Sequence, residues 1–130
     1  GGFGILDIIA IIVTVNAIMF ETISDIQMHR FAQKKKSGEY IRTGLWKYSR
    51  HPNYFGEVTF WWGLWLFGIS ADLSYWWTII GPVAITLLFV FVSIPMMEKR
   101  NLKRRSGYKE YQKEVSALIP WIPKNKLMQK

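Results

Sequence analysis

The stretch YWWTIIGPVAITLLFVFVSIPMM, residues 75–97, contains no charged side chain. An α-helix needs about 20 consecutive apolar residues to cross the hydrocarbon core of a bilayer, and this stretch exceeds that length. An apolar run of this kind is typical of a transmembrane helix and not of a water-soluble domain. We therefore expect residues 75–97 to span a membrane.

Two further apolar segments lie N-terminal to this stretch. Residues 3–20 are almost uniformly apolar, and helical spacing continues from there to Phe31. Residues 58–70 are also apolar but short. They reach spanning length if their helix begins at Pro52, a position that suits proline because the first turn of a helix needs no N–H donor there. The sequence thus predicts an all-α fold, a multi-span transmembrane helix bundle with about three spans, at residues 3–31, 52–70 and 75–97.

The positive charges are segregated along the chain. All 17 lysines and arginines lie within residues 30–50 or 99–130, and the connection at residues 70–74 has none. Three spans of alternating direction place both basic segments on one side of the membrane, which the positive-inside rule makes cytoplasmic. We therefore expect a multi-pass protein of the bacterial inner membrane or endoplasmic reticulum, with a cytoplasmic basic loop and a cytoplasmic tail at residues 98–130.

The motif RHPNYFGE, residues 50–57, places polar groups at the start of the second span. Asn53 and Glu57 lie one helical turn apart and share a side of the helix. A carboxylate at membrane depth costs a few kcal/mol unless it faces a polar cavity or a partner, so this spacing favours a functional site. The alternative is a plain helix start, with Arg50 facing lipid phosphates and Tyr54 in the interfacial belt.

A second polar group follows the first span. Glu21, Asp25 and His29 recur at helical spacing and share one face. The face is either a solvated helix end or the wall of a polar pocket at the cytoplasmic mouth. The residue spacings do not support a metal site, and the absence of cysteine excludes both disulfides and thiolate ligands.

The tail at residues 98–130 is strongly basic. Topology and attraction to anionic lipids explain most of these bases, although its arginines would also suit a pyrophosphate or a ribose phosphate. Glu98 stands alone among them, which suggests an internal ion pair or a partner for a ribose hydroxyl. The embedded spans argue against nucleic-acid binding. Residues 108–119 return to helical spacing, which predicts a short helix that Pro120 ends.

Four motifs together resemble, in order and spacing, the C-terminal half of the steroid 5-alpha-reductase-like membrane proteins, and most closely their uncharacterised bacterial-type branch: FETISDIQMHRF, GLWKYSRHPNYFGE, IPMMEKR and GYKEYQKEVSALIPWIP. The wider superfamily also includes sterol reductases and isoprenylcysteine carboxyl methyltransferases. The resemblance covers essentially the whole chain. It implies an NADPH-dependent reductase of a carbon–carbon double bond conjugated to a carbonyl, in a steroid-like or other lipid substrate.

The resemblance also implies which residues would form the cofactor site. By position these are Asp25, Arg50, His51, Asn53, Tyr54, Glu57, Glu98, Arg100, Tyr108 and Tyr111. Asn53 and Glu57 would hydrogen-bond the nicotinamide end, and Asp25 would join the polar wall. The tail residues would close over the ribose and phosphates.

The catalytic residues cannot be assigned in this chain. In the steroid reductases, the acid and the tyrosine that polarise the substrate carbonyl lie upstream of the matching region. The chain also opens without methionine. We therefore expect residues 1–130 to be a single membrane domain, the C-terminal cofactor-binding half of a longer protein.

Two other functions remain open. The first is an S-adenosylmethionine-dependent methyltransferase of the isoprenylcysteine carboxyl type, which would share the RHPNY motif. Such enzymes usually carry two consecutive glutamates after the last span, whereas here Glu98 follows Met97. The second is a non-catalytic membrane scaffold, with basic segments that bind anionic lipids.

Overall fold

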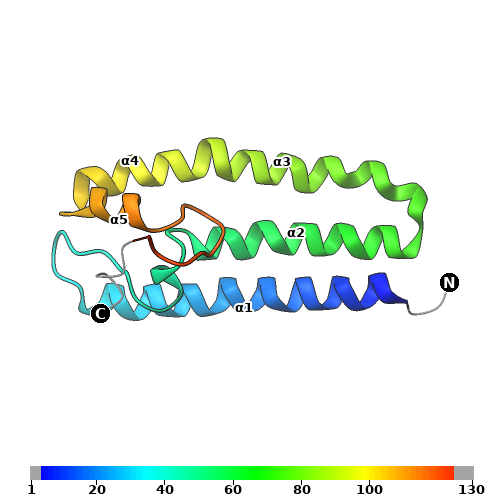
Figure 1. Ribbon diagram of the computed structural model, residues 1–130, viewed down its shortest axis with the longest axis horizontal. Coiled ribbons are helices and arrows are strands. Elements are labelled where there is room, and N and C mark those ends of the chain that lie inside the picture. The colour runs from blue at the N-terminus through cyan, green and yellow to red at the C-terminus, as the bar shows by residue number, and fades with distance from the viewer. Residues whose placement is uncertain (1–3, 125–130) are drawn as a thin grey trace.

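The computed structural model describes residues 4–124, and its core is three long helical rods lying side by side (Figure 1). The first rod is α1 (Ile5–Lys34), and the middle rod is α2 (Pro52–Ala71). The third rod consists of η2 (Leu73–Ile79), α3 (Ile80–Leu88), the π-helix η3 (Phe89–Ser93) and α4 (Ile94–Arg104). The prediction of an all-helical fold is confirmed, since no named strand occurs within residues 4–124.

Within residues 4–124, two helical stretches are long and apolar enough to cross a membrane: Ile5–Lys34 and Leu73–Arg104. They correspond to the spans expected at residues 3–31 and 75–97, although residue 3 lies outside the described residues. The helix α2 has 20 residues, beginning at Pro52 with His51 as its N-cap, as the position of the proline predicted. A third span at α2 stays a prediction.

Small residues bring α1 and α2 into close contact. Ala10, Ala17 and Ser24 recur every seventh residue on α1 and are fully buried, and Gly56 and Gly63 lie at the same spacing on α2. Small residues at this spacing let two helix backbones approach closely, which is how helices associate in lipid. This contact holds the first two rods together over most of their length.

The proline in the third rod alters the helix without ending it. Pro95 lies in the first turn of α4, directly after the π-helix at Phe89–Ser93. Proline has no N–H to donate to the carbonyl four residues earlier, and the local π geometry accommodates that missing bond. The rod continues to Arg104, so Pro95 distorts the helix locally and does not end it.

The loop before α2 and the tail gather at one end of the rods (Figure 1). The loop contains the short 3₁₀-helix η1 (Gly44–Lys47), and the tail contains α5 (Tyr108–Glu114). The prediction of a helix to residue 119 is wrong, because α5 stops at Glu114. Beyond it, the backbone carbonyls of the tail bond to the loop instead of continuing a helix.

Candidate functional site

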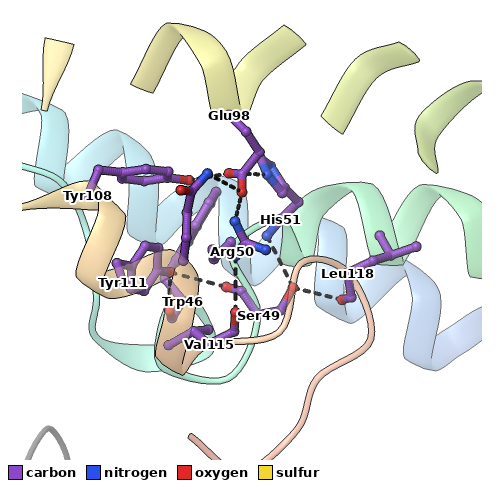
Figure 2. A network of polar contacts seen from close by, with 10 residues as sticks. Trp46, Ser49, Arg50, His51, Glu98, Tyr108, Tyr111, Val115 and Leu118 are labelled. Atoms are coloured by element: carbon purple, nitrogen blue, oxygen red, sulfur yellow. Dashed lines mark hydrogen bonds and ion pairs between the residues drawn. The ribbon is translucent and has the colours of Figure 1, made fainter. Parts of the chain in front are cut away.

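A buried carboxylate forms the centre of the polar network at this end of the molecule (Figure 2). Glu98 of α4 is only 8% exposed. It forms an ion pair with Arg50, and its Oε2 lies 3.0 Å from Nε2 of His51 and accepts a hydrogen bond of 2.5 Å from the Tyr108 hydroxyl. The Gln112 side chain donates to Oε1 at 3.1 Å. The network thus joins α4 to the start of α2 and to α5.

The loop before α2 is fixed to the tail at the same place. The Ser49 hydroxyl donates to the carbonyl of Leu118 at 2.7 Å and accepts from the backbone N–H of His51 at 3.1 Å. Nε of Arg50 donates to the carbonyl of Val115 at 3.0 Å. These bonds leave Arg50 and His51 little freedom to turn away from Glu98.

The charges in the network follow from its burial. Burial, and secondarily the positive charge of Arg50, lowers the pKa of the His51 imidazole from 6.5 to about 4. His51 is therefore neutral at pH 7. Since an ionised carboxylate only accepts hydrogen bonds, Nε2 of His51 carries the proton and donates to Glu98. Burial also lowers the pKa of Arg50, but an arginine stays charged at neutral pH, so Arg50 and Glu98 form a neutral pair.

A cavity of about 310 Å³ lies beside this network, and its lining is aromatic and basic. The aromatic lining residues are Phe31, Tyr40, Trp46, Tyr54, Tyr108 and Tyr111. The basic lining residues are Lys35, Arg50, Arg100 and Arg105. Among the described residues, the lining includes one acid, Glu39, so basic residues are in excess. A concave site with an excess of one charge attracts ligands of the opposite charge, so the cavity suits an anion that also has flat rings.

One polar atom in the cavity lining has no partner. Oδ1 of Asn53 is buried and accepts no hydrogen bond from residues 4–124. A buried acceptor without a donor costs about 1–3 kcal/mol, and a ligand N–H group would relieve that cost. The neighbouring wall is well ordered, because the Tyr54 ring stacks on His51 with 5.2 Å between ring centroids and packs against Phe89 at 4.8 Å. Asn53 thus carries an unsatisfied acceptor beside the cavity.

The structure brings most, but not all, of the residues expected at a cofactor site to this cavity. Those that line it are Arg50, His51, Asn53, Tyr54, Arg100, Tyr108 and Tyr111. Asp25 and Glu57 are exposed and lie outside the lining. The structure therefore brings Asn53, but not Glu57, to the cavity lining. Of the two roles considered for Glu98, the structure shows the internal ion pair. Cofactor binding by any of these residues stays a prediction.

The lining residues that were not expected from the sequence include Lys35, Tyr40 and Trp46, whereas Arg105 is one of the tail arginines expected to suit a phosphate. Two of them are aromatic residues inside the basic loop, a pattern that could have indicated a binding surface. The indole of Trp46 donates to the carbonyl of Ser24 at 3.2 Å, and the Trp46 carbonyl accepts from the Tyr111 hydroxyl. Trp46 thereby ties the loop to α1 and α5.

The chain matches one family profile, described as "Protein of unknown function (DUF1295)", over residues 1–115. The chain belongs to the DUF1295 family. The resemblance to the steroid 5-alpha-reductase-like superfamily is thereby confirmed, because this family is part of that superfamily. The particular branch and its activity stay predictions.

Two curated proteins resemble this DUF1295 chain over 79 residues. An uncharacterized protein of Schizosaccharomyces pombe is 34% identical over 60% of the chain and 23% of its own length. Methanethiol S-methyltransferase 1 of Bradyrhizobium diazoefficiens is 33% identical over 59% of the chain and 25% of its own length. The chain spans about a quarter of the length of these curated relatives. No solved structure matches it.

Proposed function

We propose that this chain forms the cofactor-binding part of a membrane-embedded, NADPH-dependent reductase that acts on a conjugated carbon–carbon double bond in a lipid-like substrate. The observation that carries the proposal is the excess positive charge of the aromatic cavity at the end of the helical rods. The cations of the cavity would bind the phosphates of NADPH, and its aromatic walls would stack on the flat rings of NADPH. When bound, it would supply the hydride.

Three cations in the cavity lining would bind the phosphates of NADPH. Lys35, Arg100 and Arg105 line the cavity, and within residues 4–124 none of the three forms an ion pair. Burial, and secondarily the charges of Arg105 and Arg100, lowers the pKa of Lys35. Like charges crowded together are unfavourable until an anion neutralises them. Arginine in particular binds phosphate through two parallel hydrogen bonds.

The remaining residues would orient the ligand. The unpaired Oδ1 of Asn53 would accept from a carboxamide N–H of the nicotinamide. The ion pair of Arg50 with Glu98 would hold the walls from α2 and α4 at a fixed separation. The cavity volume of about 310 Å³ is at the lower end of the range for sites that bind a small molecule or cofactor. The remainder of a longer protein would therefore complete the site, and it would also provide the groups that polarise the substrate carbonyl.

S-adenosylmethionine-dependent methyl transfer is the second candidate. The 33% identity to a methanethiol S-methyltransferase favours it. The charge of the cavity favours it less, because S-adenosylmethionine has a cationic sulfonium and a single carboxylate in place of phosphates. A small or lipid-bound nucleophile would then replace the conjugated alkene as the substrate.

Direct binding measurements on the purified full-length protein separate the two candidates. We expect NADPH to bind more tightly than S-adenosylmethionine, and Arg105→Gln to weaken NADPH binding about tenfold, equivalent to about 1.4 kcal/mol. The control is Arg104→Gln, since Arg104 is exposed and outside the cavity lining. Binding of S-adenosylmethionine without binding of NADPH would refute the reductase proposal.

A further inference from the structure

The segment after α5 presents apolar side chains outward from a fixed backbone. Ile119, Trp121 and Ile122 are 63%, 72% and 69% exposed. Hydrogen bonds hold the backbone around them in place. The Trp121 N–H donates to the carbonyl of Tyr48 at 3.0 Å, and the carbonyl of Leu118 accepts from the Ser49 hydroxyl at 2.7 Å. Large apolar side chains held away from the protein in this way indicate an interaction surface.

An apolar groove lies within this segment. It has a volume of about 290 Å³ and is lined by Tyr48, Pro120, Trp121 and Ile122. A cation lies at its edge, since Nζ of Lys47 is 5.7 Å from the centre of the Tyr48 ring. The surface therefore combines an apolar trough with a positive rim.

We propose that residues 119–122, here called the tail anchor, insert into the interfacial layer of the bilayer, where the groove holds the upper part of a phospholipid acyl chain. The tail anchor lies at the end of the rods beside the first turns of α2 (Figure 1). That is the depth at which a helix beginning at Pro52 would enter the membrane. The inference does not depend on any cofactor, so it stands apart from the reductase proposal.

Two of the four backbone nitrogens of the tail anchor need no hydrogen bond from water. Pro120 has no N–H, and the N–H of Trp121 is bonded within the protein. Backbone donors without partners are what keep most loops out of membranes. Tryptophan also prefers the membrane–water interface, because its ring is apolar and its N–H is polar.

The charge beside the groove decides between lipid and protein as the occupant. The ammonium group of Lys47 lies at the groove edge, and the exposed Lys124 lies two residues beyond the tail anchor. Lysine is depleted in the buried centre of protein interfaces, whereas lipid phosphates attract it at the membrane surface. The surface therefore fits a phospholipid better than another protein segment.

A site-specific fluorescence experiment tests the proposal. The chain contains no cysteine, so a cysteine introduced at Ile122→Cys can carry a single environment-sensitive fluorophore. The exposed Lys109 of α5 provides the matched control, Lys109→Cys. Both proteins are reconstituted in vesicles of phosphatidylcholine and phosphatidylglycerol, with or without a nitroxide on the lipid acyl chain.

We expect the nitroxide lipid to reduce emission of the label at residue 122 by about twofold or more, since an interfacial segment lies about 5–10 Å into the headgroup and acyl boundary. Emission of the label at residue 109 should barely change. Equal quenching of both labels by aqueous iodide would overturn the proposal, because the segment would then lie in water. Protection of residue 122 from both quenchers would also overturn it, and would place the segment against protein.

Discussion

The buried imidazole of His51 makes a specific prediction about acid stability. His51 is 4% exposed, and its pKa is lowered from 6.5 to about 4. The folded protein therefore binds a proton at this site less readily than the unfolded chain. This difference adds stability above about pH 6.5, and the added stability is lost as the pH falls from 6.5 to about 4.

The size of the effect follows from the pKa values. One pKa unit corresponds to about 1.4 kcal/mol, so lowering a pKa from 6.5 to about 4 amounts to about 3 kcal/mol. Carboxylates also titrate in this range, so the total loss of stability on acidification does not isolate the contribution of His51. The difference between wild type and His51→Asn does, because the asparagine does not titrate.

The assay is unfolding in detergent micelles at pH values from 4 to 7.5. We expect wild type to lose about 3 kcal/mol more than His51→Asn across this range. His29→Asn is the matched control, since His29 is exposed. Only the slope is compared, because His51→Asn also lowers the absolute stability.

The opposite sign would refute the reasoning. If Glu98 acted as a full negative charge on His51, the pKa of the imidazole would rise, and stability would fall as the pH increased through that raised value. We expect the reverse because the ion pair with Arg50 already neutralises Glu98. Isotope-labelled histidine spectra provide an independent check, because this chain has two histidines. A pKa at or above 6.5 for the buried one would contradict the argument.

Four further substitutions test the packing and the network by thermal unfolding. Gly56→Ala should cost about 1–3 kcal/mol, because its Cβ would lie 2.7 Å from a backbone nitrogen of α1. Gly68→Ala has open space around it and should instead gain up to about 1 kcal/mol, and equal effects of the two would contradict the close helix contact. Glu98→Gln should cost about 3–5 kcal/mol because it leaves Arg50 charged, buried and unpaired, and a cost below 1 kcal/mol would show that this charge is solvated. Tyr111→Phe should cost about 1–3 kcal/mol because it removes the donor to a buried carbonyl of η1, and no change would mean that water replaces it.

Local rules in the sequence were enough to predict the helices. Proline at residue 52 marked the start of α2, and the apolar run ending at residue 97 marked the third rod. Charge segregation predicted that the loop and the tail lie on one side of the membrane, and the two segments do gather at one end of the rods (Figure 1). Each of these inferences needs only periodicity, length or charge within one segment.

Contacts between segments that are distant in the sequence could not be predicted from these local rules. The helical spacing after residue 108 is genuine, yet α5 ends at Glu114, because the tail carbonyls bond Ser49 and Arg50, more than 60 residues earlier. Glu57 has the spacing of a pocket residue, but the rotation of α2 leaves it exposed. That rotation is set by the small residues that pack α1 against α2, which spacing within α2 alone does not reveal.

The Arg50 and Glu98 pair is best explained by what it holds in place. A buried ion pair adds little net stability, since desolvation offsets the attraction. In lipid, however, apolar surfaces alone do not drive helices together, so polar contacts and small residues must do so. The first two rods have their small-residue contact. The third rod is held to α2 by polar contacts along its length, with the Glu98 network at one end and the indole of Trp62 donating to Thr86 at 2.9 Å near the middle. Losing the Glu98 contact would free the rod at the end that forms a wall of the cavity, so the ion pair preserves the shape of the cavity more than the fold.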